Sequence, residues 1–115
     1  MRVWLDDLRD PTLAHIQAGY GSTGDEVWVK TVPEVMALLK TGQVRSISLD
    51  NDLGEGEVEG YAVACFIEEA AWMGTLAPLE VFAHSDNSVA NPRMRAAIGN
   101  AQRYWAAGSP GRTPE

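Results

Sequence analysis

This 115-residue chain has one cysteine, no long hydrophobic run and few basic residues. The single cysteine, Cys65, excludes an internal disulfide, so we expect a reducing, cytoplasmic environment. No apolar run approaches the roughly 20 residues of a membrane-spanning helix. The charged start, MRVWLDDLRD, also lacks the apolar core of a signal peptide. We therefore expect no association with a membrane.

Positive charge is scarce, because nine Lys and Arg stand against sixteen Asp and Glu, a formal net charge of -7. Such a surface repels nucleic-acid phosphates, and general binding to duplex nucleic acid is not expected. A metal ion or a local basic strip would still allow one phosphate-containing small molecule or an RNA end to bind. The sequence contains no Walker loop, GxGxxG, HExxH, CxxC or GxSxG pattern, and it leaves the oligomeric state open.

Short apolar runs alternate with helical patterns along the chain. The predicted strands are 2–5, 27–29, 44–49 and 79–83, and the predicted helices are 31–42, 61–73 and 91–105. Residues 10–24 have weak periodicity and predict a loop with one helical turn at 13–17. Alternating strands and helices favour a parallel sheet with right-handed crossovers. The expected fold is α/β, a three-layer, trimmed flavodoxin-like sandwich with strand order 2-1-3-4 and no visible fifth strand.

Two of the predicted helices begin with capping signals. Thr31 and Glu34 have the spacing of a capping box, and Asn91 stands before a proline. The length suits one domain. We assign that domain to 1–107 and a flexible tail, rich in Ser, Pro and Gly, to 108–115.

Polar side chains follow three of the predicted strands. In chain order they are Asp6 and Asp7, Asp50 and Asp52, and His84 and Ser85. Ligands of open parallel sheets bind beyond the carboxyl ends of the strands, near the point where the strand order reverses. We therefore expect these side chains to meet in one pocket.

The four acids, Asp6, Asp7, Asp50 and Asp52, predict a cation site. Two unit charges about 4 Å apart repel by roughly 4 kcal/mol at an effective dielectric constant of 20. Such a cluster must hold a divalent cation, share protons or spread into water. Its hard oxygen ligands suit Mg²⁺ or Mn²⁺, and also Ca²⁺, better than zinc. The alternative is that each acid is an ordinary turn or cap residue.

Candidate phosphate-binding groups follow the strand at 79–83. His84 exchanges protons near neutral pH, so it could act as a general acid or base, or bind phosphate as a cation. Ser85 and Asn87 could donate hydrogen bonds to an anion. Arg93 lies in the first turn of a helix, where its charge opposes the helix dipole and favours anion binding. The alternatives are a packed histidine, simple capping and a solvated arginine.

Two motifs resemble a known family. The segments VWLDDLRDP (3–11) and ISLDNDLG (47–54), followed by Gly60-Tyr61 and His84-Ser85-x-Asn87, are similar to cyclic-phosphate processing receiver domains. The resemblance covers about residues 1–105. It implies a receiver-like fold, related to response-regulator receiver domains.

The same resemblance implies roles for particular residues. In receiver domains, acids at the positions of Asp6, Asp7 and Asp50 hold Mg²⁺. The family name further implies phosphoester chemistry on cyclic phosphate ends or cyclic nucleotides. This chain differs from the family at Asn51, where histidine is usual, and at Ala90, where glycine is usual.

The first functional hypothesis is a metal-dependent phosphoesterase that opens RNA 2′,3′-cyclic phosphate ends or cyclic nucleotides. In this hypothesis His84, Asp50 and Asp7 are catalytic, and His84 protonates the leaving oxygen. The metal ligands are Asp6, Asp7, Asp50 and Asp52. The substrate phosphate is oriented by Ser85, Asn87, Arg93 and Asn51.

Two other hypotheses use the same edge of the sheet. A non-catalytic module would bind phosphate, a nucleotide or a protein partner there, and Asn51 in place of the usual histidine favours it. A signalling receiver would accept a phosphoryl group on Asp50. That activity needs a lysine after a fifth strand, and no lysine occurs after Lys40.

Overall fold

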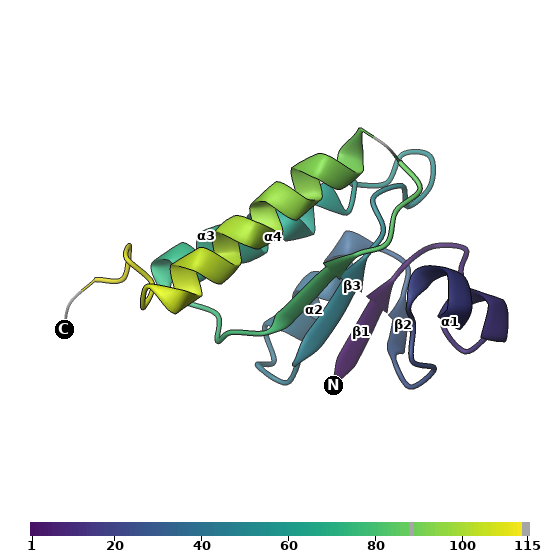
Figure 1. The fold of residues 1–115 in the computed structure, drawn as a ribbon, viewed down its shortest axis with the longest axis horizontal. Helices are drawn as coiled ribbons and strands as arrows, with labels where there is room; N and C mark the ends of the chain where they lie inside the picture. The colour runs from purple at the N-terminus through teal and green to yellow at the C-terminus, as the bar shows by residue number, and fades with distance from the viewer. Residues whose placement is uncertain (88, 114–115) are drawn as a thin grey trace.

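The computed structural model describes residues 1–87 and 89–113 (Figure 1). Strands and helices alternate along the whole chain. In order they are β1 (Arg2–Leu5), α1 (Ala14–Tyr20), β2 (Val27–Val29), α2 (Val32–Leu39), β3 (Ser46–Leu49), α3 (Tyr61–Met73), β4 (Glu80–Ala83) and α4 (Ala90–Ala106).

The strands of the described residues form one parallel sheet with the order β2-β1-β3-β4. Val3 of β1 is opposite Val27 on one side and Ile47 on the other, and Ile47 is opposite Val81 of β4. The predicted strand order and the α/β, flavodoxin-like fold class are confirmed. The order reverses between β1 and β3, so the carboxyl ends of these two strands define the expected binding position.

One face of the sheet carries the main hydrophobic core. Val3, Leu5, Ile47 and Leu49 point to this face and pack with apolar residues of α2, α3 and α4. The alternation of side chains along each strand explains why these residues share a face. The three helices therefore form one layer of the sandwich, with the sheet as the next.

On the opposite side of the sheet, α1 lies beside β2 at the edge (Figure 1), and a cavity of about 350 Å³ over β1, β3 and β4 leaves part of this face open. Trp4 points to this side and is 1% exposed, although Phe82 on the neighbouring part of the face is 51% exposed. The Trp4 ring stacks on His84 with 3.8 Å between ring centroids, and its Nε1 donates to the carbonyl of Arg9. An aromatic side chain of β1 thus supports the site at the carboxyl edge.

The capping contacts predicted at two helix starts need correction, although Thr31 is the residue before α2, as predicted. Thr31 precedes α2, but its hydroxyl bonds the Glu34 carboxylate instead of capping a backbone amide. The helix predicted from Asn91 begins at Ala90. The residue before it is Val89, and Asn87 bonds the helix start from further upstream, since its Oδ1 accepts from the amides of Val89 and Ala90. An asparagine side chain can reach amides two and three residues ahead, and this satisfies the free end of α4.

The segment predicted as a loop with one helical turn contains the seven-residue helix α1. It buries only Ile16 among its residues, which explains why its apolar pattern is weak. The predicted strand at 44–49 is shorter and begins at Ser46. Beyond α4, the amide of Gly111 bonds the carbonyl of Trp72. The flexibility assigned to 108–115 stays a prediction, and its last two residues lie outside the described part.

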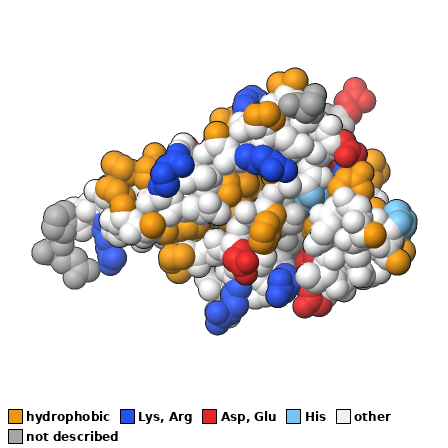
Figure 2. All heavy atoms as spheres, viewed as in Figure 1, with side chains coloured by type: hydrophobic (Ala, Val, Ile, Leu, Met, Phe, Trp, Pro, Cys, Tyr) orange, Lys and Arg blue, Asp and Glu red, His pale blue; other side chains and the backbone are white. Residues whose placement is uncertain are grey.

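Charged side chains at the amino ends of the strands stand on the surface. Figure 2 shows basic and acidic groups side by side there, below the sheet in this view. Arg2, Arg45 and Glu80 are all exposed. Among the described residues, no helix has the length and apolar character that crossing a membrane requires.

Candidate metal and phosphate site

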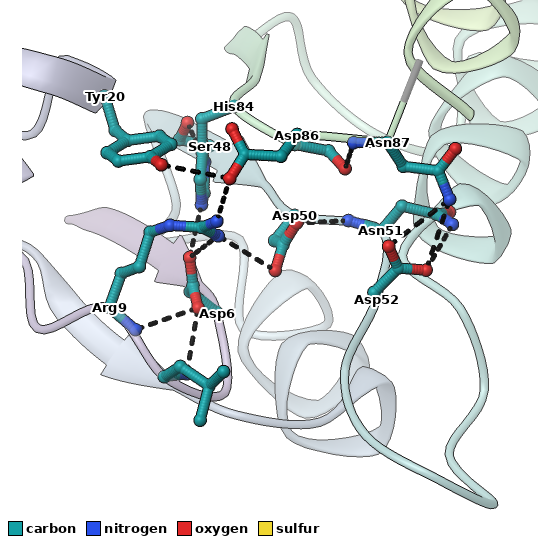
Figure 3. Close-up of polar contacts among 12 residues, drawn as sticks. Asp6, Arg9, Tyr20, Ser48, Asp50, Asn51, Asp52, His84, Asp86 and Asn87 are labelled. Atoms are coloured by element: carbon teal, nitrogen blue, oxygen red, sulfur yellow. Dashed lines mark hydrogen bonds and ion pairs between the residues drawn. The ribbon is translucent and has the colours of Figure 1, made fainter. Parts of the chain in front are cut away.

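The carboxyl ends of β1, β3 and β4 bring Asp6, Asp50 and His84 together, as predicted (Figure 3). The strand pairing itself continues into these residues. The amide of Asp6 bonds the carbonyl of Val29, and the amide of Asp50 bonds the carbonyl of Leu5. Both carboxylates are therefore fixed by the rigid sheet rather than by free loops.

Asp6 is the centre of the hydrogen-bond network and is fully buried. Its Oδ1 accepts from the amides of Leu8 and Arg9, both at 2.9 Å. Its Oδ2 accepts from His84 Nε2 and Arg9 Nη1, both at 3.1 Å. Burial acts to raise the pKa of Asp6, but the bonds from His84, the two amides and the Arg9 side chain outweigh it and lower the pKa to about 2.

Asp50 has the opposite electrostatic character although it is also buried, at 4% exposure. Burial, followed by the negative charge of Asp6, raises the pKa of Asp50 to about 6. The charges of His84 and Arg9 and a 2.9 Å bond from the Asn51 amide oppose this shift only in part. Asp50 is thus the carboxylate with the greater need for a further positive charge.

Asp7 completes a group of three carboxylates. One oxygen each of Asp6, Asp7 and Asp50 lie within 4.8 Å of one another. Oxygen donors of this kind, two of them on buried side chains, are those that Mg²⁺ and Mn²⁺ prefer. The donor set fits a divalent cation. Asp52, the fourth predicted ligand, lies outside this group, and its exposed carboxylate accepts from Asn87 Nδ2 at 3.3 Å.

His84 is held on both edges of its imidazole ring. Nε2 bonds Asp6 as described, and Nδ1 lies 2.7 Å from the hydroxyl of Ser48. The ring also stacks on Trp4 with an angle of 7° between the planes. The N–H at Nε2 donates to Asp6, and Nδ1 shares a hydrogen bond with the Ser48 hydroxyl. His84 therefore orients the Asp6 carboxylate in this arrangement.

Two side chains that were predicted to bind phosphate, Ser85 and Asn51, form hydrogen bonds with nearby backbone amides. The Ser85 hydroxyl accepts from the Asn87 amide at 3.0 Å. The Asn51 side chain is buried, accepts from the Tyr61 amide at 3.0 Å and donates to Glu59. These contacts fix the starts of α3 and α4. Whether these groups also bind a phosphate stays a prediction.

Arg93, also predicted to bind phosphate, lies apart from the three carboxylates. It is exposed on α4, stands 3.7 Å from Glu59 and lies over the Tyr61 ring at 4.5 Å from the centroid. Its guanidinium thus faces the beginning of α3. A role in binding would be at the rim of the site.

The sequence interpretation missed Arg9, the cation closest to the acids. Its guanidinium contacts Asp6 and Asp50 at 3.1 and 3.5 Å and also pairs with Asp86. Tyr20 stacks against it and bonds Asp86. The available signal was an arginine three residues beyond a strand-end aspartate. Together with neighbouring side chains, Arg9 lines a cavity of about 290 Å³ beside the acids.

The chain belongs to the family of cyclic-phosphate processing receiver domains, since the family model matches residues 1–100. This confirms the resemblance found in the two aspartate motifs. Comparison with curated proteins and with solved structures gave no significant match. The fold and the acidic triad agree with a receiver domain, and the family's name connects it with the processing of cyclic phosphates.

Proposed function

We propose that this chain is a metal-dependent phosphoesterase that opens cyclic phosphates, either at RNA 2′,3′-cyclic ends or in cyclic nucleotides. The observation that carries the proposal is the cluster of Asp6, Asp7 and Asp50, with oxygens within 4.8 Å, next to the buried His84. Membership in the family supports the same substrate class.

The reaction adds one water across one ring ester bond. A new bond forms between the water oxygen and phosphorus, the ring P–O bond breaks, and the released sugar oxygen takes a proton. A divalent cation held by Asp6, Asp7 and Asp50 would neutralise phosphate oxygens and activate the water. His84 supplies the proton to the leaving oxygen, and its contact with Ser48 keeps the ring oriented.

The surroundings favour a small phosphate ligand over a duplex. The cavity of about 290 Å³ beside Asp7 and Asp50 has room for a cyclic phosphate end. Asp86 lines this cavity as well, and its small volume would admit the end of a chain more easily than the side of a helix. Ser85, Asn87 and Arg93 would orient the bound phosphate from the α4 side, and Asn51 from the α3 side.

The test is hydrolysis of 2′,3′-cyclic nucleotides with Mg²⁺ or Mn²⁺, followed by the appearance of the 2′- or 3′-monophosphate in ³¹P NMR. Asp50→Asn should lower the rate by about 100-fold or more, since even the loss of an outer-shell partner of a metal costs 10–100-fold. His84→Gln should lower it by roughly 100-fold. Asp25→Asn, an exposed acid near the amino edge, is the matched control. Absence of turnover with both ions, or an unchanged rate in Asp50→Asn, would contradict the proposal.

A second candidate function is a non-catalytic module that binds a phosphate or nucleotide at this site. The observation that favours it is the full engagement of His84 by Ser48 and Asp6, together with the burial of Asn51 in contacts to α3. Calorimetry with the same nucleotides separates the two functions. Binding without turnover would support the module.

A further inference from the structure

Arg9 is a positive side chain among the carboxylates that the proposed function assigns to a metal. Its Nη1 lies 3.1 Å from Asp6 Oδ2 and 3.5 Å from Asp50 Oδ2. Its Nη2 pairs with Asp86 on the other side (Figure 3). The guanidinium is therefore a counter-ion already present in the acid cluster.

The two oxygens of each buried carboxylate have different partners. Asp6 Oδ1 accepts from the amides of Leu8 and Arg9, and Asp50 Oδ1 accepts from the amide of Asn51. The remaining oxygens, both Oδ2, face the guanidinium. A divalent cation needs carboxylate oxygens at roughly 2.0–2.6 Å. Arg9 Nη1 lies between the two Oδ2 atoms, in the position that a cation bridging them would take, so the two compete for it.

Contacts outside the cluster keep Arg9 in this position. Its guanidinium carbon lies 4.3 Å from the centroid of the Tyr20 ring. The Tyr20 hydroxyl donates to Asp86 at 3.0 Å, and Asp86 in turn pairs with Arg9. Asp86 is exposed, and the Arg9 side chain retains 22% exposure. The side chain thus has a path to solvent.

We infer that Arg9 competes with a divalent cation for Asp6 and Asp50, and that the released guanidinium binds the phosphate of the ligand. The inference rests on the proposed metal and phosphate site. Release needs only a rotation of the side chain, because the Arg9 amide is fixed to Asp6. The freed group borders the cavity beside Asp50, and a guanidinium binds phosphate through two parallel hydrogen bonds.

The first test measures Mn²⁺ affinity by calorimetry for the wild type, Arg9→Gln and Arg9→Lys. Arg9→Gln should bind Mn²⁺ about tenfold more tightly, a coupling of ordinary size between two competing ligands. Arg9→Lys keeps a competing charge and should stay close to the wild type. Arg2→Gln, which removes a charge at the other end of β1, is the control and should change the affinity less than twofold.

The second test adds 3′-AMP. In the wild type the nucleotide should tighten Mn²⁺ binding, because the phosphate holds the released Arg9 away from the carboxylates. The enhancement should fall by about tenfold in Arg9→Gln. The wild type alone gives a third measurement, which does not depend on a variant that folds. Addition of Mg²⁺ should shift the side-chain ¹⁵N–H signals of Arg9 and speed their exchange with solvent.

Equal or weaker Mn²⁺ binding by Arg9→Gln, or Arg9 signals that ignore saturating Mg²⁺, would overturn the inference. So would the absence of Mn²⁺ binding in every variant. The hydrolysis assay is independent of these outcomes. Turnover without tighter binding in Arg9→Gln rejects the role of Arg9 and keeps the enzyme. Tighter binding without turnover keeps the role of Arg9 and rejects the enzyme.

Discussion

Charged side chains differ in solvent exposure between the two ends of the sheet. At the amino ends, Arg2 and Glu80 are exposed to solvent. At the carboxyl ends, Asp6, Asp50 and His84 are 0%, 4% and 7% exposed. Burial of an ionised group costs free energy unless partners compensate for the lost water. The comparison shows that the fold accepts the free-energy cost of burying charged groups at the carboxyl edge alone among these positions, as the proposed site requires.

The two buried aspartates differ in the number of hydrogen-bond donors and positive charges around them, and this difference decides which carboxylate is stabilised in its ionised form. Asp6 receives four hydrogen bonds, and its pKa falls to about 2. Asp50 has the longer contact to Arg9 and lies close to Asp6, and its pKa rises to about 6. One carboxylate is therefore a structural anchor, while its neighbour lacks sufficient positive charge.

The largest effect that distinguishes the two ends should come from Asp6→Asn. The change leaves His84 and Arg9 without their common carboxylate, and we expect the free energy of unfolding to fall by about 3–5 kcal/mol. Urea denaturation at pH 7 with EDTA measures it. Asp25→Asn removes an acid from the exposed pair with Arg2 and should cost less than about 0.5 kcal/mol. Similar losses in both variants would refute the contrast.

A backbone change should have the next largest effect. A Cβ on Gly60 would lie 1.8 Å from the carbonyl oxygen of Asp50, where the chain returns to begin α3. Gly60→Ala must displace the end of β3, and we expect a loss of about 3 kcal/mol in stability together with weaker Mn²⁺ binding. Gly42→Ala, near the amino edge, meets no atom within 4 Å. Because its φ is +72°, it should cost only about 1 kcal/mol. An unaltered melting temperature in Gly60→Ala would contradict the close approach of Gly60 to the Asp50 carbonyl.

The smallest effect, and the one with reversed sign, should come from Asp50→Asn. The pKa of Asp50 in the folded protein, about 6, exceeds the ordinary value of 3.8. Protonation therefore favours the folded state, and wild-type stability should rise as the pH falls from 7 through 6 toward 4. The raised pKa of Asp50 corresponds to a destabilisation of roughly 3 kcal/mol at pH 7, which the substitution removes. Burial of the new amide group costs part of this gain, so Asp50→Asn should stabilise the metal-free protein by about 2 kcal/mol at pH 7.

Chemical denaturation of both proteins between pH 4 and pH 7.5, with EDTA, checks this prediction. The difference between them should be greatest at the upper end and should vanish near pH 4. Below pH 4 both proteins should lose stability, because the Asp6 pKa of about 2 lies under its unfolded value. A difference that stays constant with pH would show that Asp50 titrates normally.

The strand ends could be predicted from the sequence because parallel strands place their carboxyl ends together. Short apolar runs that stop at Asp6, Asp50 and His84 were enough to predict their meeting. The helix at 61–73 was also predicted with its observed bounds, since glycines flank it on both sides. Local patterns and one topological rule therefore account for the fold and for the principal site residues.

The remaining part of the site depends on where loops turn and which way side chains point, and a sequence pattern does not predict either. The amides of Leu8 and Arg9 donate to Asp6, and these bonds turn the loop back over the end of β1. The Arg9 side chain therefore lies beside the acids. Ser48 meets His84 only through the register of β3 with β4. The helix α1 was predicted only as one turn at 13–17, because one buried residue gives it little periodicity. Side-chain contacts between different helices and strands become visible only in the three-dimensional structure.

The stacked pair of Trp4 and His84 gives the protein an optical reporter of its own. The indole and imidazole ring centroids are 3.8 Å apart and the rings are almost parallel, so a proton gained by the imidazole places a cation on the indole face. Tryptophan emission responds to such a neighbour by quenching. With the other three tryptophans replaced, the fluorescence of Trp4 would follow the charge of His84 without any attached label.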